Sequence, residues 1–364
     1  MVSSLETEGT RPSRPEGQGC RYRRGVVEVT LPASWYADAL VWGRERRAVF
    51  GCEWLLVGHG QGLSEPGDYV ACDIAGWPLV VVVDEGGVLR AHHNVCRHRA
   101  GPVVREGCGR VPSLVCRYHG WSYGLDGRLR AARDFGATDG FEPAEISLTG
   151  ALVEGWRGLV FVNLDLDRRA PPLPEALGTF AEECEPYPIE ELVVTHEAQH
   201  DLACNWKTYA DNYLEGYHIP LVHPALSKDI DVKRYVVDVD ERHRWVRHSA
   251  PARDGAVSGG CWLWRWPNLA LNLYPDAMNV ERYDPVTPNR TRLRYSYSFR
   301  RPGDHEANEA VIRTSAQVTT EDIAICESVQ RNLESGTYDT GWLSPKHERG
   351  VAAFQRWVRE TVDD

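Results

Sequence analysis

The sequence has no long hydrophobic run. Its longest strongly apolar stretch, about Trp77 to Val83, is far shorter than the roughly 20 residues that a membrane-spanning helix needs. Residues 1–24 mix Glu, Arg, Gly, Pro and Ser without an apolar segment, which argues against a secretory signal peptide and favours a disordered tail. We therefore expect a protein that does not span a membrane and that stays in the cytoplasm.

An excess of positive charge is also missing. The chain has 41 Lys and Arg against 52 Asp and Glu, so its formal net charge is −11. This is the wrong sign for wrapping a phosphate backbone, which excludes nucleic acid as an expected partner. The ten cysteines are scattered along 364 residues rather than concentrated in a short secreted chain. They predict thiols rather than a disulfide scaffold, and those beside histidines become candidate metal ligands.

A dinucleotide fingerprint is missing as well. The stretch Gly58-His59-Gly60-Gln61-Gly62 is rich in glycine, but it lacks the G-x-G-x-x-G spacing and a helix after it. It predicts a turn, and the chain itself is not expected to bind a nicotinamide cofactor.

What is present indicates an α+β protein of two domains. Residues 25–50 carry a helical pattern and are expected to pack on the second domain. Residues 51–163 contain short β-branched and aromatic runs separated by glycine turns, which predicts a small all-β domain. Residues 164–364 open with a proline-rich stretch and then alternate strand patterns with helical patterns over Trp206–Gly216 and Asp322–Leu333. This second domain is predicted to be an antiparallel sheet with helices.

Two short motifs in the β domain each combine a cysteine with a histidine, namely Cys96-x-His98 and Cys116-x-x-His119. Two such loops can place both sulfurs on one iron and both imidazoles on the other iron of a Rieske [2Fe-2S] cluster. A structural zinc site is the alternative, because two cysteines and two histidines also bind zinc. Zinc sites usually pair cysteine with cysteine and histidine with histidine, so the mixed pairs favour the Rieske cluster.

A second set of candidate ligands lies in the predicted catalytic half of the chain. His218 and His223 are five residues apart, so in a continuous helix they would lie on different faces. Gly216 and Pro220 break the helix here, which allows the second histidine to turn toward the first. Two imidazoles and one carboxylate on one face of a ferrous ion leave the opposite face open to oxygen and substrate. Each histidine alone would be better explained as a buried core residue, but together they predict an iron site.

Asp322 is the candidate for the carboxylate. The residues three, four, seven and eleven positions after it are Ile325, Cys326, Val329 and Leu333. Asp322 would therefore head an apolar stripe, whereas Glu321 and Glu327 would lie off it. An acid on an inward face needs a partner, which a metal supplies. The alternative is an acid that only complements the dipole of the helix in its first turn.

Two further acids are candidates for a supporting role. Glu215 precedes His218 by three residues and would share its helical face, so it is predicted to hold the imidazole or to connect the iron to an electron donor. Asp211 lies one turn further back and is the competing candidate for this role, with an exposed helix acid as its alternative.

In this order, the two constellations resemble the α subunits of Rieske-type non-haem iron oxygenases, the family of the aromatic-ring-hydroxylating dioxygenases. The resemblance extends from about Thr30 to the end of the chain. The matching segments are Asn205-Trp206-Lys207, Tyr217-His218-Ile219-Pro220, Pro267-Asn268-Leu269 and Glu321-Asp322. They are most similar to the branch of the choline and glycine betaine monooxygenases.

The resemblance implies a Rieske β domain joined to a helix-grip catalytic domain. By match, the cluster ligands would be Cys96, His98, Cys116 and His119, and the iron ligands would be His218, His223 and Asp322. Members form homotrimers or multiples of them, in which the cluster of one subunit serves the iron of the next. An acid at the position of Glu215 would connect a cluster histidine, here His119, to His218. Three departures from the pattern are Ala100 in place of a frequent glycine, Arg117 in place of a frequent proline, and Glu rather than Asp at 215.

The predicted function is that of a terminal oxygenase, which uses the cluster and a mononuclear Fe(II) to activate O2 and hydroxylate a small organic substrate, with or without N-demethylation. Electrons would come from NAD(P)H through a separate flavin and iron-sulfur reductase, directly or through a ferredoxin. An aromatic-ring dioxygenase or a biosynthetic tailoring oxygenase is the alternative. A Rieske electron-transfer protein is the non-enzymatic alternative, although it would not need the two histidines and the acid.

The substrate stays open. Trp262, Trp264 and Trp266 alternate along one predicted strand, so all three would point to one face. They could form part of a cage for a quaternary ammonium group, or they could pack in the core.

Overall fold

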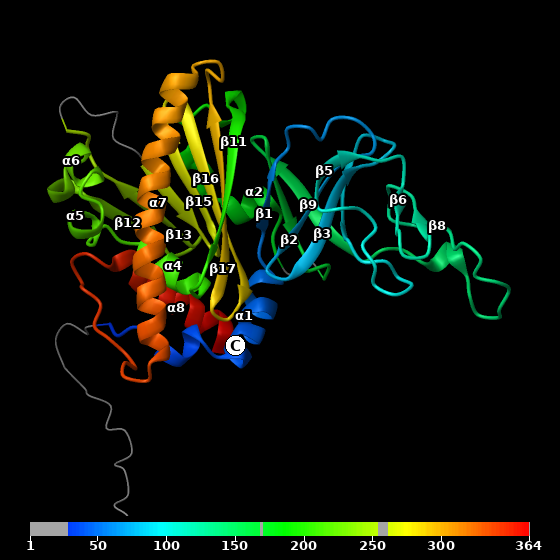
Figure 1. The fold of residues 1–364 in the computed structure, drawn as a ribbon, viewed down its shortest axis with the longest axis horizontal. Helices are drawn as coiled ribbons and strands as arrows, with labels where there is room; N and C mark the ends of the chain where they lie inside the picture. The colour runs from blue at the N-terminus through cyan, green and yellow to red at the C-terminus, as the bar shows by residue number, and fades with distance from the viewer. Residues whose placement is uncertain (1–27, 168–169, 254–260, 364) are drawn as a thin grey trace, which may run out of the picture.

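The computed structural model describes residues 28–167, 170–253 and 261–363, so the tail predicted over residues 1–24 lies outside the described part of the chain. The described chain forms two lobes that lie side by side, each built around a seven-stranded antiparallel sheet (Figure 1). The α+β fold class expected from the sequence is confirmed. Within the three described ranges, no helix combines the length and the apolar content needed to cross a membrane.

The first lobe is all β, with the strand order β1-β10-β9-β4-β3-β2-β5 and a small second sheet β6-β7-β8. Its strands are β1 (Leu55–His59), β2 (Asp68–Ile74), β3 (Trp77–Val83), β4 (Leu89–His93), β5 (Gly107–Arg110), β6 (Leu114–Val115), β7 (Ser122–Tyr123), β8 (Leu129–Ala131), β9 (Gly150–Trp156) and β10 (Leu159–Asn163). Along β3, Leu79 and Val81 face a core shared with the second lobe, whereas Val80 and Val82 face the core beneath the two Cys-His loops. Because both faces are covered, this strand is apolar throughout.

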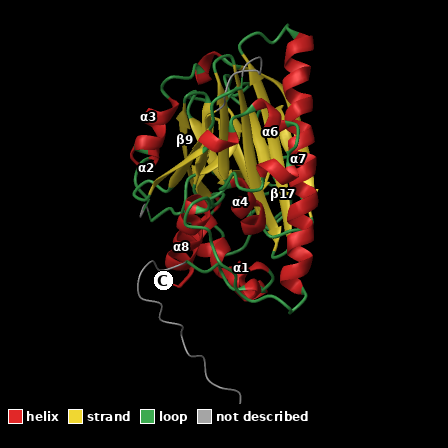
Figure 2. Cartoon of the chain, turned by 90° about the vertical axis from the view of Figure 1, so that its left-hand side faces the viewer, coloured by secondary structure: helices red, strands yellow, loops and turns green. Residues whose placement is uncertain are grey.

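The second lobe combines a sheet of order β11-β17-β16-β15-β14-β13-β12 with helices. Its strands are β11 (Val193–Leu202), β12 (Val236–Asp240), β13 (Trp245–Ser249), β14 (Cys261–Arg265), β15 (Leu269–Tyr274), β16 (Ala277–Thr287) and β17 (Arg290–Phe299). The long helix α7 (His305–Glu334) runs along one face of this sheet, and α4 (Trp206–Tyr213) packs against α7 (Figures 1 and 2). The other α-helices are α1 (Ala39–Glu45), α2 (Leu173–Leu177), α3 (Thr179–Cys184), α5 (Ile219–Val222), α6 (Leu226–Asp229) and α8 (Arg349–Asp363).

Two helices differ in extent from the sequence prediction. Helix α7 begins at His305 rather than at Asp322. The sequence did not predict its first turns because they carry few apolar side chains and show no clear stripe, although Val311 packs against the core. Helix α4 ends at Tyr213, three residues before the predicted Gly216. The proline-rich stretch that opens the second domain contains α2 and α3, whose apolar side chains are buried in a core formed by both lobes.

The buried face of α7 also differs from the expected apolar stripe. Its buried residues are Thr319, Asp322, Cys326 and Gln330. Asp322 does face inward, but Ile325 and Val329 are 38% and 40% exposed, so this part of the prediction was wrong. The inward face is largely polar and its groups have hydrogen-bond partners, for example Thr319 with the hydroxyl of Tyr295 at 3.0 Å. A stripe defined by hydrophobicity could not mark such a face.

Two of the three alternating tryptophans belong to the core. Trp264 and Trp266 are almost fully buried and pack against Phe354 and Trp357 of α8. The rings of Trp264 and Trp357 are stacked, with centroids 6.2 Å apart and an interplanar angle of 5°. For these two residues core packing, rather than a ligand cage, is the observed role.

A buried arginine joins the two lobes. Arg282 on β16 donates two hydrogen bonds of 2.7 Å to the carbonyl oxygens of Leu56 and Val57 on β1. Its charge is balanced by Asp284 at 2.8 Å. Since the donors of the guanidinium satisfy main-chain acceptors of the other lobe, this contact fixes β1 against the catalytic sheet.

A second buried ion pair attaches the N-terminal helices to the catalytic lobe. Lys207 Nζ lies 2.5 Å from Glu45 Oε1, and both side chains are fully buried. Lys207 also donates to Asn205 Oδ1 at 2.9 Å, and Trp206 Nε1 donates to the other oxygen of Glu45 at 2.9 Å. Each charge is stable in this place only because the other is present.

Replacing Lys207 by Met should therefore destabilise the protein by about 3–5 kcal/mol, because it leaves the carboxylate of Glu45 buried without a cation. The fall in the thermal unfolding midpoint of the purified holoprotein measures this effect. The double variant Lys207→Met with Glu45→Gln keeps an acceptor for Trp206 and should recover most of the loss. Equal destabilisation in the single and double variants would contradict this account.

Candidate metal centres and the active-site cavity

The two Cys-His loops repeat one backbone pattern. The amide of Ala100 donates to the carbonyl oxygen of Cys96 at 3.0 Å, and the amide of Gly120 donates to that of Cys116 at 2.9 Å. Ala100 and Gly120 both have positive φ, 57° and 75°. Glycine adopts this conformation freely, whereas alanine is strained there by roughly 1–2 kcal/mol. Despite this strain, Ala100 keeps the same backbone hydrogen bond and positive φ as Gly120 in the second loop.

These loops place two thiols inside and two imidazoles outside. Cys96 and Cys116 are buried, whereas His98 is half-buried and His119 is exposed, and the two imidazole centroids lie 4.6 Å apart. Burial raises the pKa of the Cys116 thiol, so a thiolate at this place requires a metal beside it. Buried sulfurs with imidazoles at the surface are a donor set that fits a [2Fe-2S] cluster with cysteines on one iron and histidines on the other. Cys108 lies apart from them, exposed on β5.

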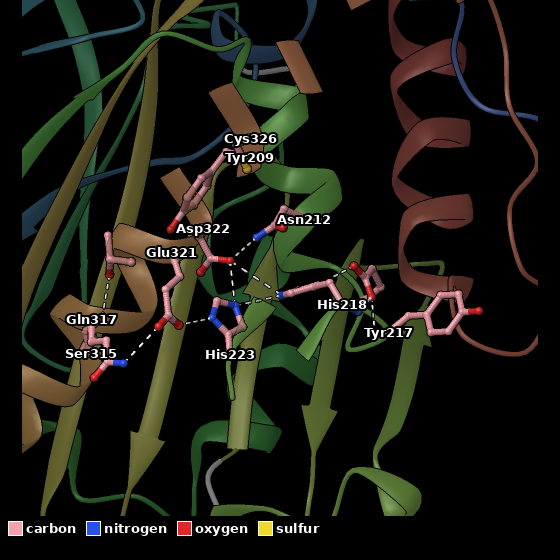
Figure 3. Close-up of polar contacts among 12 residues, drawn as sticks. Tyr209, Asn212, Tyr217, His218, His223, Ser315, Gln317, Glu321, Asp322 and Cys326 are labelled. Atoms are coloured by element: carbon pink, nitrogen blue, oxygen red, sulfur yellow. Dashed lines mark hydrogen bonds and ion pairs between the residues drawn. The ribbon is translucent and has the colours of Figure 1, made fainter. Parts of the chain in front are cut away.

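The second set of candidate ligands converges at one point. His218 precedes the single turn of α5 and His223 follows it, while Asp322 reaches them from α7 (Figure 3). His218 Nε2 lies 3.1 Å from His223 Nε2, and Asp322 Oδ1 lies 3.7 Å from His218 Nε2 and 3.0 Å from His223 Nε2. Among the described residues, this is the group of histidines and acids that is compact enough for a single metal ion.

A carboxylate faces the outer nitrogen of each imidazole in this group. His218 Nδ1 lies 2.5 Å from Glu215 Oε1, and His223 Nδ1 lies 2.7 Å from Glu321 Oε2 (Figure 3). A neutral imidazole that donates from Nδ1 has a lone pair at Nε2, so two lone pairs and the oxygen of Asp322 point toward one another. Three acceptors at this separation repel unless a cation lies between them. The residues present therefore fit a mononuclear metal ion.

Glu321 is a residue of this candidate site that the sequence did not predict. The periodicity of α7 excluded it from the inward face, but its carboxylate reaches His223, as described above, and also accepts from Gln317 at 3.0 Å. Its position next to Asp322 could have identified it, because two adjacent helical residues can contact the two ring nitrogens of one histidine.

The two candidate supporting acids have different places. Glu215 lies at His218, where its carboxylate also accepts hydrogen bonds from the amides of Tyr217 and His218. The structure does not bring Asp211 to His218. Instead, Asp211 accepts from the hydroxyl of Tyr36 at 2.6 Å and from Gln355 at 3.0 Å, and burial raises its pKa to about 7. Asp211 therefore joins α4 to the N-terminal segment and to α8.

A cavity of about 730 Å³ opens beside the three convergent ligands, between the sheet, α4, α5 and α7. Its aromatic lining comprises Tyr209, Tyr213, Tyr235, Trp262, Tyr274, Tyr295 and Phe299. Its acidic lining comprises Glu215, Asp229, Asp276, Glu281, Asp304 and Asp322, whereas Arg301 is the cationic residue found there in the described part of the chain. The cavity is thus aromatic and has an excess of negative charge.

Trp262 is the member of the alternating tryptophans that lines this cavity. Its ring lies parallel to that of Tyr235, with centroids 6.4 Å apart and an interplanar angle of 16°. The three tryptophans therefore have two different environments: Trp262 lines the cavity, whereas Trp264 and Trp266 are buried in the core under α8.

Two further cavity residues gave no signal in the sequence. Glu281 on β16 is 4% exposed, and burial raises its pKa to about 7. His248 on β13 is 1% exposed, and neither of its ring nitrogens has a hydrogen-bond partner among the described residues. Both lie in strands whose alternation resembles that of any buried strand, so only the register of the sheet reveals that they face the cavity.

Comparison with known proteins agrees with this geometry. Residues 53–142 match the model of the Rieske [2Fe-2S] domain, and residues 189–364 match that of the ring-hydroxylating α subunit catalytic domain. The choline monooxygenase of Beta vulgaris is 30% identical over 345 residues, which cover 92% of this chain and 77% of that protein. The carnitine monooxygenase oxygenase subunit of Acinetobacter pittii is 30% identical over 357 residues, covering 92% and 95% of the two chains.

Solved structures show the same architecture. The quaternary ammonium Rieske monooxygenase CntA in complex with L-carnitine has a TM-score of 0.83 to this chain at 29% identity, covering 92% of this chain and 96% of that one. Naphthalene 1,2-dioxygenase from Rhodococcus sp. has a TM-score of 0.76 at 18% identity and shares the fold. The matched ranges leave the predicted domain boundaries at residues 51, 163 and 164 as predictions.

These matches decide between the alternatives left by the sequence. The Cys-His motifs lie in a Rieske domain, which excludes the structural zinc site, and the catalytic domain excludes a protein dedicated to electron transfer. The cofactors are a Rieske [2Fe-2S] cluster and a mononuclear iron, with O2 as co-substrate. The chain belongs to the Rieske-type non-haem iron oxygenases, the family of the ring-hydroxylating α subunits.

Proposed function

We propose that this oxygenase hydroxylates a methyl group on the nitrogen of a small quaternary or tertiary methylamine. The observation that carries this proposal is the cavity, which is aromatic and adjoins the convergent ligands. Besides Glu215 and Asp322 of the iron site, four further acids line it against one guanidinium. A cavity of this kind favours organic cations through cation-π attraction and Coulomb attraction. The similar proteins named above for choline, carnitine and quaternary ammonium compounds support it.

The reaction consumes one O2 and two electrons: R–CH3 + O2 + NAD(P)H + H⁺ gives R–CH2OH + NAD(P)⁺ + H2O. When the CH2OH group is on nitrogen, it leaves as formaldehyde and the product is demethylated. Aromatic-ring dioxygenation gains less support, because the likeness to naphthalene dioxygenase at 18% identity concerns the fold alone.

The proposal assigns the ligands residue by residue. The cluster would be held by Cys96, His98, Cys116 and His119, and the iron by His218, His223 and Asp322. When bound, the cluster passes single electrons and the iron activates O2. Glu215 and Glu321 orient the two imidazoles, and the aromatic walls hold the methyl group near the iron and exclude water.

Rieske oxygenases work with a separate reductase and often form trimers. We propose a homotrimer for this chain, or a multiple of it, served by a flavin and iron-sulfur reductase with or without a ferredoxin. The cluster loop between β6 and β7 lies at the opposite end of the molecule from α5, which carries the iron histidines (Figure 1). Electrons would therefore pass between subunits, from exposed His119 of one to Glu215 and His218 of the next. The cytoplasmic location expected from the sequence stays a prediction.

Replacing Asp322 by Ala should remove the mononuclear iron and leave the cluster. Iron analysis should fall from about three to about two atoms per chain, with an unchanged Rieske EPR signal. Product formation from the methylamine that the wild-type protein oxidises should fall by more than about 100-fold, beyond the effect of losing an outer hydrogen-bond partner. The control is Glu306→Ala, an exposed acid near the start of the same helix. Turnover retained by Asp322→Ala would refute the ligand assignment.

Replacing Glu215 by Gln should slow the arrival of electrons at the iron. We expect the oxidation of the pre-reduced cluster, followed by its absorbance in a single turnover, to slow by about 10–100-fold while iron content changes little. Glu321→Gln is the matched variant, because it removes the corresponding acid from His223 Nδ1 without touching the proposed path. If both variants oxidise their clusters at the wild-type rate, the path through Glu215 is wrong.

A further inference from the structure

We propose that Glu281 is the counter-ion for the cationic head of the substrate and sets the preference of this enzyme for an ammonium group over a neutral group of the same shape. This inference rests on the proposed function, because it concerns the cavity in which the methylamine would bind. It adds a residue that neither the motifs nor the ligand set identified.

Glu281 lies on the wall of the cavity, in a fixed orientation. Asn272 Nδ2 donates to Glu281 Oε1 at 2.6 Å, and the hydroxyl of Tyr209 donates to Glu281 Oε2 at 3.0 Å. Tyr213 in turn donates to Asn272 Oδ1 at 2.7 Å, so the amide cannot turn away. The carboxylate is therefore held by neutral donors on two sides while it still lines the open space.

No cation in the described part of the chain pairs with Glu281. Two other buried carboxylates have one: Glu45 pairs with Lys207 and Asp284 pairs with Arg282. Asp211 is also held by neutral donors, but it does not line the cavity. A buried carboxylate without a cation is costly, which is why its pKa rises. A cationic ligand in the cavity would supply the missing charge, whereas a neutral ligand would leave the carboxylate desolvated and unpaired.

The surroundings of Glu281 suit a methylated ammonium ion better than a primary one. Tyr209, Tyr295 and Trp262 line the same cavity, and the hydroxyl of Tyr209 lies 3.2 Å from that of Tyr295. A quaternary ammonium group has no N–H to donate, so it gains from ring faces and from a carboxylate that is already hydrogen-bonded by others. Glu281 meets this requirement, because protein donors already occupy both of its oxygens.

The test compares Glu281→Gln with the wild-type holoenzyme, reduced anaerobically and treated with nitric oxide. The probes are tetramethylammonium, choline and 3,3-dimethyl-1-butanol, which is the neutral isostere of choline. Their Kd values come from the change that each causes in the iron-nitrosyl EPR signal. In Glu281→Gln, the Kd of both cations should rise by at least about 30-fold, and that of the neutral alcohol should change by less than about twofold. Glu306→Gln, which removes an exposed charge, should leave all three unchanged.

Each outcome decides something. Cations that bind Glu281→Gln as tightly as wild type overturn the counter-ion, and so does a wild-type protein that binds the neutral alcohol as well as choline. A wild-type protein whose nitrosyl signal responds to none of the three probes overturns the proposed methylamine function and the counter-ion with it. Unchanged iron content and an unchanged Rieske signal in Glu281→Gln show that the variant is folded.

A different observation carries a second inference: we infer that His248 hydrogen-bonds an oxygen atom of the substrate. His248 lines the cavity between Tyr213 and Tyr235, whose ring centroids lie 5.8 Å from its own. Burial lowers its pKa to about 3, so the imidazole is neutral and has one donor and one acceptor. With both nitrogens unpartnered and the side chain buried, a substrate oxygen is the group that would satisfy it.

This role predicts a preference for choline over ethyltrimethylammonium, which lacks the hydroxyl. The wild-type preference in Kd, from the same nitrosyl signal, should be about 5–100-fold and should vanish in His248→Phe while ethyltrimethylammonium binds as before. His248→Gln, which keeps a donor and an acceptor, should retain part of it. Glu281→Gln should weaken both compounds equally. A preference that persists in His248→Phe, or a wild-type protein without one, overturns the role of His248.

Discussion

The catalytic lobe is organised around the mutual repulsion of three acceptors. Glu215 and Glu321 fix the Nδ1 protons of His218 and His223, so both Nε2 lone pairs point at the carboxylate of Asp322. Such a site is stable only around a cation, and the surrounding fold holds the ligands in place for it. The break after α4 and the single turn of α5 bring the two histidines together, and α7 supplies both Asp322 and Glu321 from adjacent positions.

The cavity depends on a second electrostatic constraint, the desolvation of charge. Elsewhere in the catalytic lobe, Glu45 and Asp284 have buried cations, and these pairs join segments that are distant in the sequence, whereas Asp211 is held by the neutral donors Tyr36 and Gln355. Beside the iron site the acids exceed the cations, and Glu281 is held by neutral donors alone. Protein interiors tolerate such an imbalance where a ligand completes it. The same cavity contains the imidazole of His248, whose nitrogens have no hydrogen-bond partner among the described residues. A polar ligand in the cavity would supply one.

The two lobes are joined through a shared core and through Arg282, while the candidate cluster loop next to β6 lies far from α5 within one chain (Figure 1). In the proposed trimer, exposed His119 of one subunit would pass electrons to the iron of another rather than to that of its own chain. Assembly of copies would then form part of the electron path.

The sequence by itself predicted most of the two candidate ligand sets, because these residues depend on local spacing. Cys96-x-His98, Cys116-x-x-His119 and the pair His218 and His223 lie within single loops or one helical turn, where chain geometry limits the possible arrangements. Asp322 was found from periodicity although the stripe behind it was partly wrong, since polar residues with hydrogen-bond partners cover the inward face of α7. Tertiary structure alone decided the contact of Glu321 with His223, the attachment of Asp211 to Tyr36 and Gln355, and the division of the tryptophans between core and cavity. It also decided that Glu281 and His248 line the cavity. Strand register and helix rotation place these side chains, and both are set by long-range packing that no local pattern encodes.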